Sequence, residues 1–210
     1  MDSAKQKPTI VRKVQERARL KLERGARHGL RWAFGFDRWH VSTLAERLYA
    51  QDIIRYLNQR DPEHRGALVE IGCGVGDILR HARYRERLGL DIDLGALSCA
   101  RFLAAVFRQG PMRFAAFRFP DDQLEGQFDV IVLVNWIHHI APEVLRGQVA
   151  SYLKERLLTG GEIIIDTVQD PAYKFNHSID LLTEGLDAEM RHLGGYARQR
   201  DVYAVRRRKQ

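Results

Sequence analysis

The stretch of the sequence best suited to chemistry is LVEIGCGVGD, residues 68–77. A short apolar run, typical of a strand, leads into three glycines at alternate positions, Gly72, Gly74 and Gly76. Glycines permit positive φ and let the backbone approach a ligand closely. Loops of this kind often bind phosphates at the start of a helix. Here, however, Glu70 and Asp77 place a carboxylic acid at each end of the loop.

The two acids argue against a phosphate ligand. The dinucleotide fingerprint requires G-x-G-x-x-G, and this loop reads G-x-G-x-G-D, so the last position is wrong by one residue. No basic residue follows the loop before Arg80, and the carboxylates would repel a pyrophosphate. A cationic ligand, such as one that carries an amino-acid group and a sulfonium, would not be repelled.

Strands and helices alternate on both sides of this loop, which predicts βαβ units. The fold class that follows is α/β, with a doubly wound, mostly parallel Rossmann-like sheet, helices on both faces and an N-terminal helical extension. Gly160 and Gly161 are expected to end one of the helices. The predicted strands are 67–71, 87–91, 113–117, 128–134 and 162–168, the helices are 76–84, 94–107, 142–158 and 178–193, and an extended stretch or hairpin covers 196–206.

The first sixty residues differ in character from the rest. Residues 1–31 hold ten Lys/Arg and three Asp/Glu, which accounts for the whole formal charge of +7. Residues 1–8 are expected to be disordered. Val11, Val14, Ala18 and Leu22 predict a helix over 9–24 that Gly25 and Gly29 interrupt, and Ser42 is a plausible N-cap of a second helix. We divide the chain into a basic helical N-terminal arm or cap, 1–60, and a ligand-binding domain, 61–210.

The sequence resembles the class I S-adenosylmethionine-dependent methyltransferases. Their first motif is an acid followed by alternating glycines, like residues 70–76, and their second ends the next strand with an acid, here Asp91. The resemblance covers roughly residues 65–206 and implies that Asp91 binds the ribose hydroxyls and that Ile92 packs on the adenine. The family often has an Asp after the third strand, where this chain has Arg118 or Phe119. The implied cofactor is S-adenosyl-L-methionine, and the implied cofactor-binding residues are Glu70, Gly72, Cys73, Gly74, Gly76, Asp91, Ile92 and Asn135.

Three histidines are candidate catalytic residues. His138 and His139 belong to the loop after the fourth strand, and His177 follows the fifth strand. A histidine near neutral pH suits a general base, which a hydroxyl acceptor requires more than other acceptors do. The alternative for each is structural: a hydrogen bond to a backbone carbonyl, a place on the surface, or the start of a helix. No metal-binding constellation is convincing.

The leading hypothesis is transfer of a methyl group to a small-molecule or glycan acceptor. One alternative is an RNA methyltransferase that grips RNA with the basic arm, and another is a non-catalytic cofactor-binding scaffold. The arm could equally meet an anionic membrane surface or a lipid-linked glycan, or remain a solvated helix face. Two cysteines without metal-ligand spacing favour a cytoplasmic location, and no apolar run is long enough to cross a bilayer.

Overall fold

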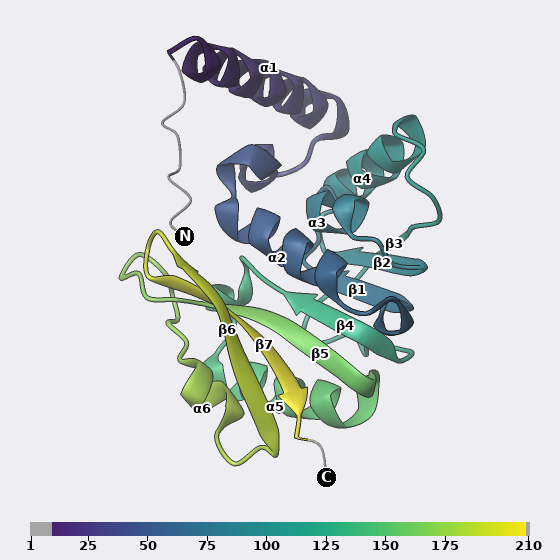
Figure 1. Cartoon of the computed structure of the whole chain (residues 1–210), viewed down its shortest axis with the longest axis vertical. Helices are drawn as coiled ribbons and strands as arrows, with labels where there is room; N and C mark the ends of the chain where they lie inside the picture. Colours follow the sequence, from purple (N-terminus) through teal and green to yellow (C-terminus); the bar gives the residue numbers. More distant parts are fainter. Residues whose placement is uncertain (1–9, 209–210) are drawn as a thin grey trace, which may run out of the picture.

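The structure is a computed structural model that describes the backbone of residues 10–208 and the side chains from residue 18. The disorder predicted for residues 1–8 lies outside the described residues. Seven strands form one sheet in the order β3-β2-β1-β4-β5-β7-β6 (Figure 1). They are β1 Ala67–Ile71, β2 Glu86–Asp91, β3 Arg113–Ala116, β4 Phe128–Leu133, β5 Leu157–Val168, β6 Ala188–Tyr196 and β7 Arg200–Arg207.

The glycine loop leaves the sheet where the strand order reverses. β1 pairs in parallel with β2 on one side and with β4 on the other, and Ile71 is level with both Leu90 and Leu133. Ligands of doubly wound sheets bind beyond the carboxyl ends of strands at such a switch point. The loops after β1, β2 and β4 therefore meet at one edge. β7 runs antiparallel to β5 and to β6, so the sheet is mostly parallel.

Helices cover both faces of the sheet, as predicted. On one face lie α2 (Leu48–Gln59), α3 (Asp77–His81) and α4 (Leu94–Val106), and on the other lie α5 (Pro142–Ser151) and α6 (Ile179–Thr183). Alternate residues of β4 supply both cores: Val130 and Val132 pack with α2 to α4, and Ile131 and Leu133 pack with α5 and α6. A strand buried on both faces must be continuously apolar, which is how this strand reads in the sequence.

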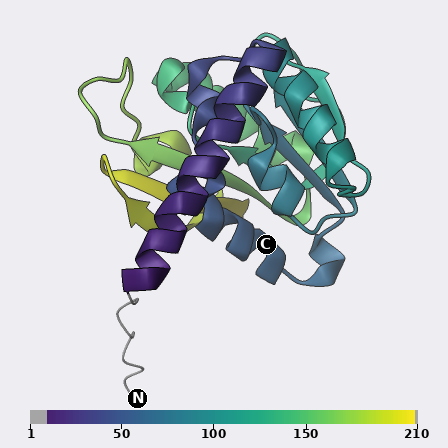
Figure 2. The ribbon, with the colours of Figure 1, turned by 90° about the horizontal axis from the view of Figure 1, so that it is seen from above.

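The N-terminal helix is longer than the sequence suggested. α1 runs without a break from Ile10 to Phe34, through both Gly25 and Gly29. A glycine inside a helix costs only about 1 kcal/mol relative to alanine, so neither residue has to end it. Figure 2 shows α1 crossing over the rest of the chain, with its first turns projecting beyond it. The predicted cap at Ser42 is also wrong, because Thr43 and Glu46 form the capping box of a short 3-10 turn, Leu44–Glu46, and α2 itself begins only at Leu48.

Two C-terminal predictions are wrong. The helix expected over 142–158 ends at Ser151 and continues as a π-helical turn, Tyr152–Arg156, so that Gly160 and Gly161 lie inside β5. The helix expected over 178–193 stops at Thr183, and the residues that follow form β6. β6 pairs along its length with β7, so the hairpin expected over 196–206 begins earlier in the chain, at Ala188. In the described part of the chain, no helix has the length and apolar composition to span a membrane.

Candidate cofactor and acceptor site

Backbone hydrogen bonds fasten the glycine loop to the end of β2. The N–H groups of Gly72 and Cys73 donate to the carbonyl of Leu90 at 2.7 and 3.0 Å. The N–H of Gly74 donates to Oδ2 of Asp91 at 2.6 Å. Gly72, Gly74 and Gly76 all have positive φ, which explains why the loop needs glycine at alternate positions.

Asp91 is buried, and it organises the two loops on either side of it. Its Oδ1 accepts from the N–H of Asp93 at 2.9 Å, while Asp93 caps α4 by accepting from Ala96. Each carboxylate oxygen has a second lone pair, so Asp91 can still accept from two hydroxyls. Ile92, the residue between the two acids, is 60% exposed and leaves an apolar surface beside them.

Glu70 is buried at the start of the loop, and its Oε2 has no hydrogen-bond partner among the described residues. Burial raises the pKa of Glu70 to about 8, against the opposing attraction of Arg47. A buried carboxyl oxygen without a partner is costly unless a ligand supplies one.

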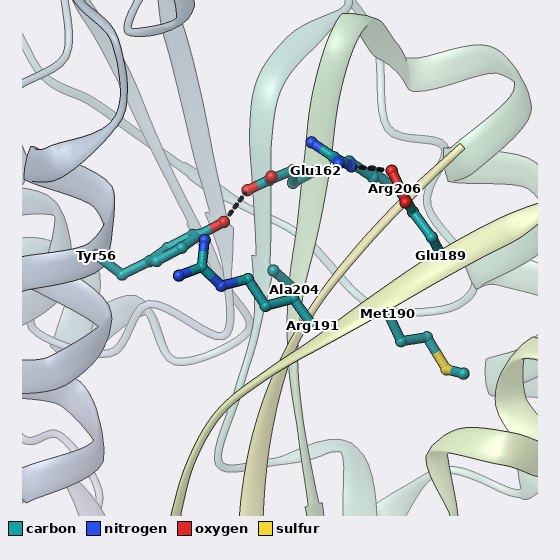
Figure 3. Close-up of a pocket in the computed structure, with 7 residues that line it drawn as sticks. All are labelled: Tyr56, Glu162, Glu189, Met190, Arg191, Ala204 and Arg206. Atoms are coloured by element: carbon teal, nitrogen blue, oxygen red, sulfur yellow. Dashed lines mark hydrogen bonds and ion pairs between the residues drawn. The ribbon is translucent and has the colours of Figure 1, made fainter. Parts of the chain in front are cut away.

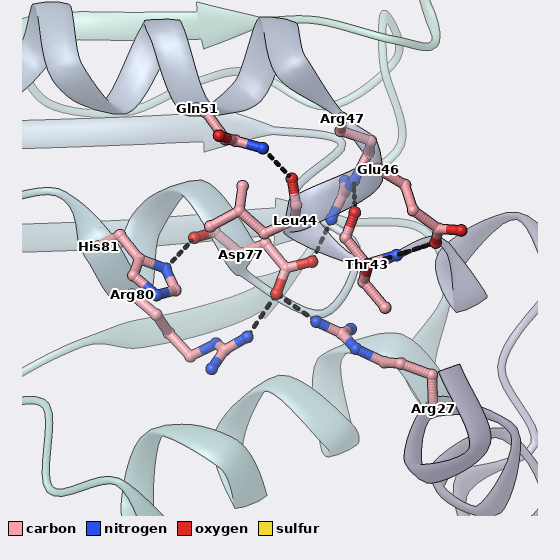
Figure 4. A network of polar contacts seen from close by, with 9 residues as sticks. All are labelled: Arg27, Thr43, Leu44, Glu46, Arg47, Gln51, Asp77, Arg80 and His81. Atoms are coloured by element: carbon pink, nitrogen blue, oxygen red, sulfur yellow. Dashed lines mark hydrogen bonds and ion pairs between the residues drawn. The ribbon is translucent and has the colours of Figure 1, made fainter. Parts of the chain in front are cut away.

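Asp77, at the other end of the loop, lies among three arginines (Figure 4). Arg27 of α1, Arg47 before α2 and Arg80 of α3 all pair with its carboxylate. Burial alone would raise the pKa of Asp77, but these three cations hold it below its usual value. From the sequence, Asp77 could either cap the following helix or contact the ligand. In the structure the N-cap of α3 is Gly76, and the fold brings two arginines from the first fifty residues to the carboxylate of Asp77.

Two aromatic rings lie over the glycines. The indole of Trp136 lies where a side chain at Gly72 would be, and its Nε1 donates to the carbonyl of Ile71 at 2.6 Å. The imidazole of His40 occupies the corresponding space at Gly74. Sequence reasoning did not assign either ring to the site. The available signals were the aromatic segment around His40 and the position of Trp136 directly after β4.

Two buried side chains, Asp166 and Arg200, hold Asn135, the second residue after β4. Asn135 has a φ of 73°, and its N–H donates to Asp166 at 2.9 Å. Arg200 of β7 pairs with Asp166, donates to Oδ1 of Asn135 at 3.0 Å and lies over the ring of Tyr49. Burial raises the pKa of Asp166 and Arg200 opposes that shift. The side chain of Asn135, a predicted cofactor ligand, is thus engaged by the protein itself.

The three histidines lie in different environments. The ring of His138 is buried and stacks on Tyr173 at 3.8 Å, and burial lowers its pKa to about 4. His177 is also buried, and its Nε2 lies 3.0 Å from the carbonyl of Ile137, so that nitrogen carries the proton. The Nδ1 atoms of both rings have no partner within the described residues. His139 is exposed, with its ring 4.3 Å from that of His138.

Comparison with known proteins identifies the domain. Residues 69–163 match the model of a family described as a methyltransferase domain. Residues 69–163 are therefore part of a methyltransferase domain.

Solved structures share the fold of this methyltransferase at low sequence identity. DhpI in complex with SAH aligns with 91% of this chain and 96% of its own, at a TM-score of 0.64 and 16% identity. Magnesium protoporphyrin IX methyltransferase from Synechocystis PCC 6803, with bound SAH, aligns with 79% of this chain and 88% of its own, at a TM-score of 0.62 and 15% identity. An S-adenosylmethionine-dependent methyltransferase from Clostridium acetobutylicum ATCC 824 aligns with 76% of this chain and 90% of its own, at a TM-score of 0.60 and 12% identity. No curated protein gives a significant sequence match.

The residues of this methyltransferase fit its cofactor, S-adenosylmethionine. The unpartnered oxygen of Glu70 suits a cationic group, and the carboxylate of Asp91 suits a pair of hydroxyls. The side-chain spaces at Gly72 and Gly74 are filled by the rings of Trp136 and His40, and that at Gly76 faces Phe114, so the fit to the cofactor depends on Glu70 and Asp91.

A cavity of about 100 Å³ lies elsewhere on the methyltransferase (Figure 3). Glu162 of β5 and Arg206 of β7 line it. Each lies six residues along its strand from the pair Val168 and Arg200, at the other end of the two strands. Tyr56 donates to Glu162 at 2.7 Å, and Arg206 pairs with Glu189. Its acidic groups therefore already have partners, and the cavity is separate from the glycine loop.

Proposed function

We propose that this methyltransferase transfers a methyl group to a small-molecule or glycan acceptor bound beside the loops that follow β4 and β5. The observation that carries the proposal is the stacked ring pair of His138 and Tyr173, together with two buried nitrogens, Nδ1 of His138 and Nδ1 of His177, that have no partner in the described chain. Aromatic and imidazole rings suit flat or amphipathic acceptors. One structural neighbour, magnesium protoporphyrin IX methyltransferase, is named for a small molecule.

The chain itself holds the cofactor and the acceptor in place. Glu70 binds the cationic end of the cofactor, Asp91 binds its ribose hydroxyls, and Ile92 lies against its adenine; Gly72, Cys73, Gly74 and Gly76 form the cradle. When bound, S-adenosylmethionine supplies an already activated methyl group, so the protein's main tasks are alignment and exclusion of water. Asn135, fixed by Asp166 and Arg200, positions the acceptor loop.

His177 is the general base for a hydroxyl acceptor in this proposal. Its Nε2 is held by the carbonyl of Ile137, which leaves Nδ1 as the proton acceptor. Burial lowers the pKa of His177, so the ring is neutral and able to accept a proton at pH 7. His138 and His139 line the same loop and contact the acceptor.

Residues 1–60 act as a cap on the domain formed by residues 61–210. Support comes from the contacts of this segment with the glycine-loop edge: the N–H of Asp37 donates to Asp93 at 2.9 Å, and His40 lies over Gly74. The proposal includes a cytoplasmic location, which the two buried free cysteines, Cys73 and Cys99, support.

Calorimetry with S-adenosylmethionine tests the cofactor half of the proposal, and NADH serves as the negative ligand. Asp91→Asn keeps one acceptor oxygen and removes the charge, so we expect at least about a tenfold loss of affinity. Asp61→Asn, at an exposed acid before the amino-terminal end of β1 and so at the opposite edge of the sheet, is the matched control. Equal affinity of the wild type and Asp91→Asn contradicts the assignment.

Transfer of labelled methyl groups tests the acceptor half. Separate pools of small metabolites, glycans and RNA are offered, and label is expected in one of the first two. His177→Gln keeps a donor toward Ile137 and removes Nδ1, so we expect kcat to fall with cofactor affinity unchanged. Label in RNA alone overturns the acceptor class, and full activity of His177→Gln overturns the base.

A further inference from the structure

The outward face of α1 is an apolar stripe. The residues that form it recur every three or four positions, so they share one side of the helix. All of them are exposed, Leu22 by 75% and Trp32 by 89%. They are Ala18, Leu22, Gly25, Ala26, Gly29, Trp32 and Ala33.

This stripe is not the face that holds α1 on the domain. Leu30 and Phe34 pack against the core on the other side, where Phe34 meets Phe102 with ring centroids 5.4 Å apart. The ion pair of Arg27 with Asp77 lies on that inner side too. A side chain added at Gly25 or Gly29 would meet nothing within 4 Å. The apolar spacing that predicted this helix includes Ala18 and Leu22. These residues therefore lie on a face of α1 that the rest of the described chain leaves exposed.

Positive charge accompanies the stripe. The α1 sequence, residues 10–34, holds eight Lys/Arg and two Glu. Lys21 is exposed beside the apolar residues. Arg24 pairs with Glu46, and Arg31 donates to the carbonyl of Phe36 at 3.2 Å, so the chain itself engages these two side chains. The helix sequence thus carries a net positive charge together with its apolar stripe.

We propose that α1 binds an anionic lipid surface, lying in the plane of the interface with Leu22 and Trp32 inserted. A helix with an apolar stripe, a tryptophan and flanking Lys/Arg has the composition of interfacial helices, whose affinity adds apolar burial to attraction by anionic headgroups. Two other partners fit α1 less well. The phosphates of a nucleic acid would pair with the charges but would leave Leu22 exposed to water. A second copy of this chain would bring two positively charged helices together, which would repel each other.

The end of α1 leads directly to the glycine-loop edge. Gly35 follows the helix, and Gly95 of α4 lies against the carbonyl of Phe34. Two further exposed apolar side chains are at this end, Leu94 by 65% and Trp39 by 67%. A lipid surface bound along α1 would therefore lie close to the entrance of the cofactor edge. The binding itself does not depend on which acceptor is methylated.

Vesicle co-sedimentation of the full chain tests the proposal. The vesicles are phosphatidylcholine alone or with an added phosphatidylglycerol fraction, and binding is expected only with the anionic lipid and to weaken as salt rises. Leu22→Glu and Trp32→Glu should each weaken partitioning by at least about tenfold, because each replaces an inserted apolar side chain with a charge. Gly25→Leu should strengthen it, since the position is open.

The matched control is Leu181→Glu on α6, where the side chain is 61% exposed and away from α1. Unchanged circular dichroism and S-adenosylmethionine affinity in each variant separate this result from the proposed function. The proposal is overturned if anionic vesicles fail to bind, or if binding survives both glutamate substitutions. It is also overturned if Leu22→Glu instead abolishes a dimer seen by sedimentation, or if RNA binds through α1 while vesicles do not.

Discussion

Glu70 and Asp77 lie at the two ends of the glycine loop, and both carboxyl groups are buried. Asp77 pairs with three arginines, which hold its pKa below the usual value. Glu70 has an oxygen with no partner in the described chain, and burial raises its pKa to about 8. One acid is therefore fully compensated by the protein, and the other keeps an oxygen that the described chain does not satisfy.

This difference separates an acid that the protein itself compensates from the acid that we propose binds the cofactor. The sequence presents them as a symmetric pair around the glycines, yet the chain places three arginines on one and none directly on the other. Arg47 is close enough to lower the pKa of Glu70 and still pairs with Asp77. Asp77 thus joins α1 and α3 to the segment before α2, whereas Glu70 remains available to a cationic cofactor.

Removal of the compensated acid should have the largest effect on stability. Asp77→Ala leaves Arg27, Arg47 and Arg80 without their shared carboxylate, and we expect a loss of about 3–5 kcal/mol in the free energy of unfolding. Urea unfolding followed by circular dichroism measures it. Asp121→Ala, at an exposed acid, is the control and should change stability by less than about 0.5 kcal/mol. An equally small loss for Asp77→Ala would mean that the arginine cluster does not hold the cap.

The uncompensated acid should instead make stability depend on pH. Folding raises the pKa of Glu70 from an ordinary value near 4.5 to about 8. The contribution of this shift to the free energy of unfolding is therefore complete below the unfolded pKa and is lost as pH rises toward 8. Glu70→Gln should therefore gain stability relative to the wild type between pH 5 and pH 8, by up to roughly 1.4 kcal/mol per pH unit. Parallel stability profiles for the two proteins would contradict the raised pKa.

Local patterns were enough to predict the core of the fold and the glycine loop. β1 and β4 read correctly because each is a short apolar run, and Asp91 stands where the next strand ends. The environment of Asp77 could not be predicted, because Arg27 lies fifty residues away in sequence. The same holds for Arg200, which reaches Asn135 across sixty-five residues from β7. β6 also differed from the prediction, because its sequence alone reads as helix while β7, the next strand in the chain, pairs with it across a short turn.

Cofactor binding is expected to release a proton through Glu70. A cation placed beside the carboxyl lowers its pKa, so a group protonated at pH 7 becomes ionised when S-adenosylmethionine binds. Calorimetry in buffers of different ionisation enthalpy measures the release. Glu70→Gln should abolish it and weaken binding by about tenfold. Proton release that persists in Glu70→Gln would assign the linkage to another group.

His138 extends the comparison to the acceptor side, with a smaller expected effect. Like Glu70 it is buried with an atom that the described chain does not partner, but burial lowers its pKa, to about 4. A pKa depressed on folding gives stability that is present above the unfolded value near 6.5 and is lost as pH falls toward 4. His138→Phe keeps a ring against Tyr173 and removes the titrating group. As pH falls from 6.5 to 5, the free energy of unfolding of this variant should therefore decrease by roughly 1 kcal/mol less than that of the wild type. His139→Phe, at the exposed neighbour, should follow the wild-type profile, and a matching change in that variant would show that burial of His138 is not the cause.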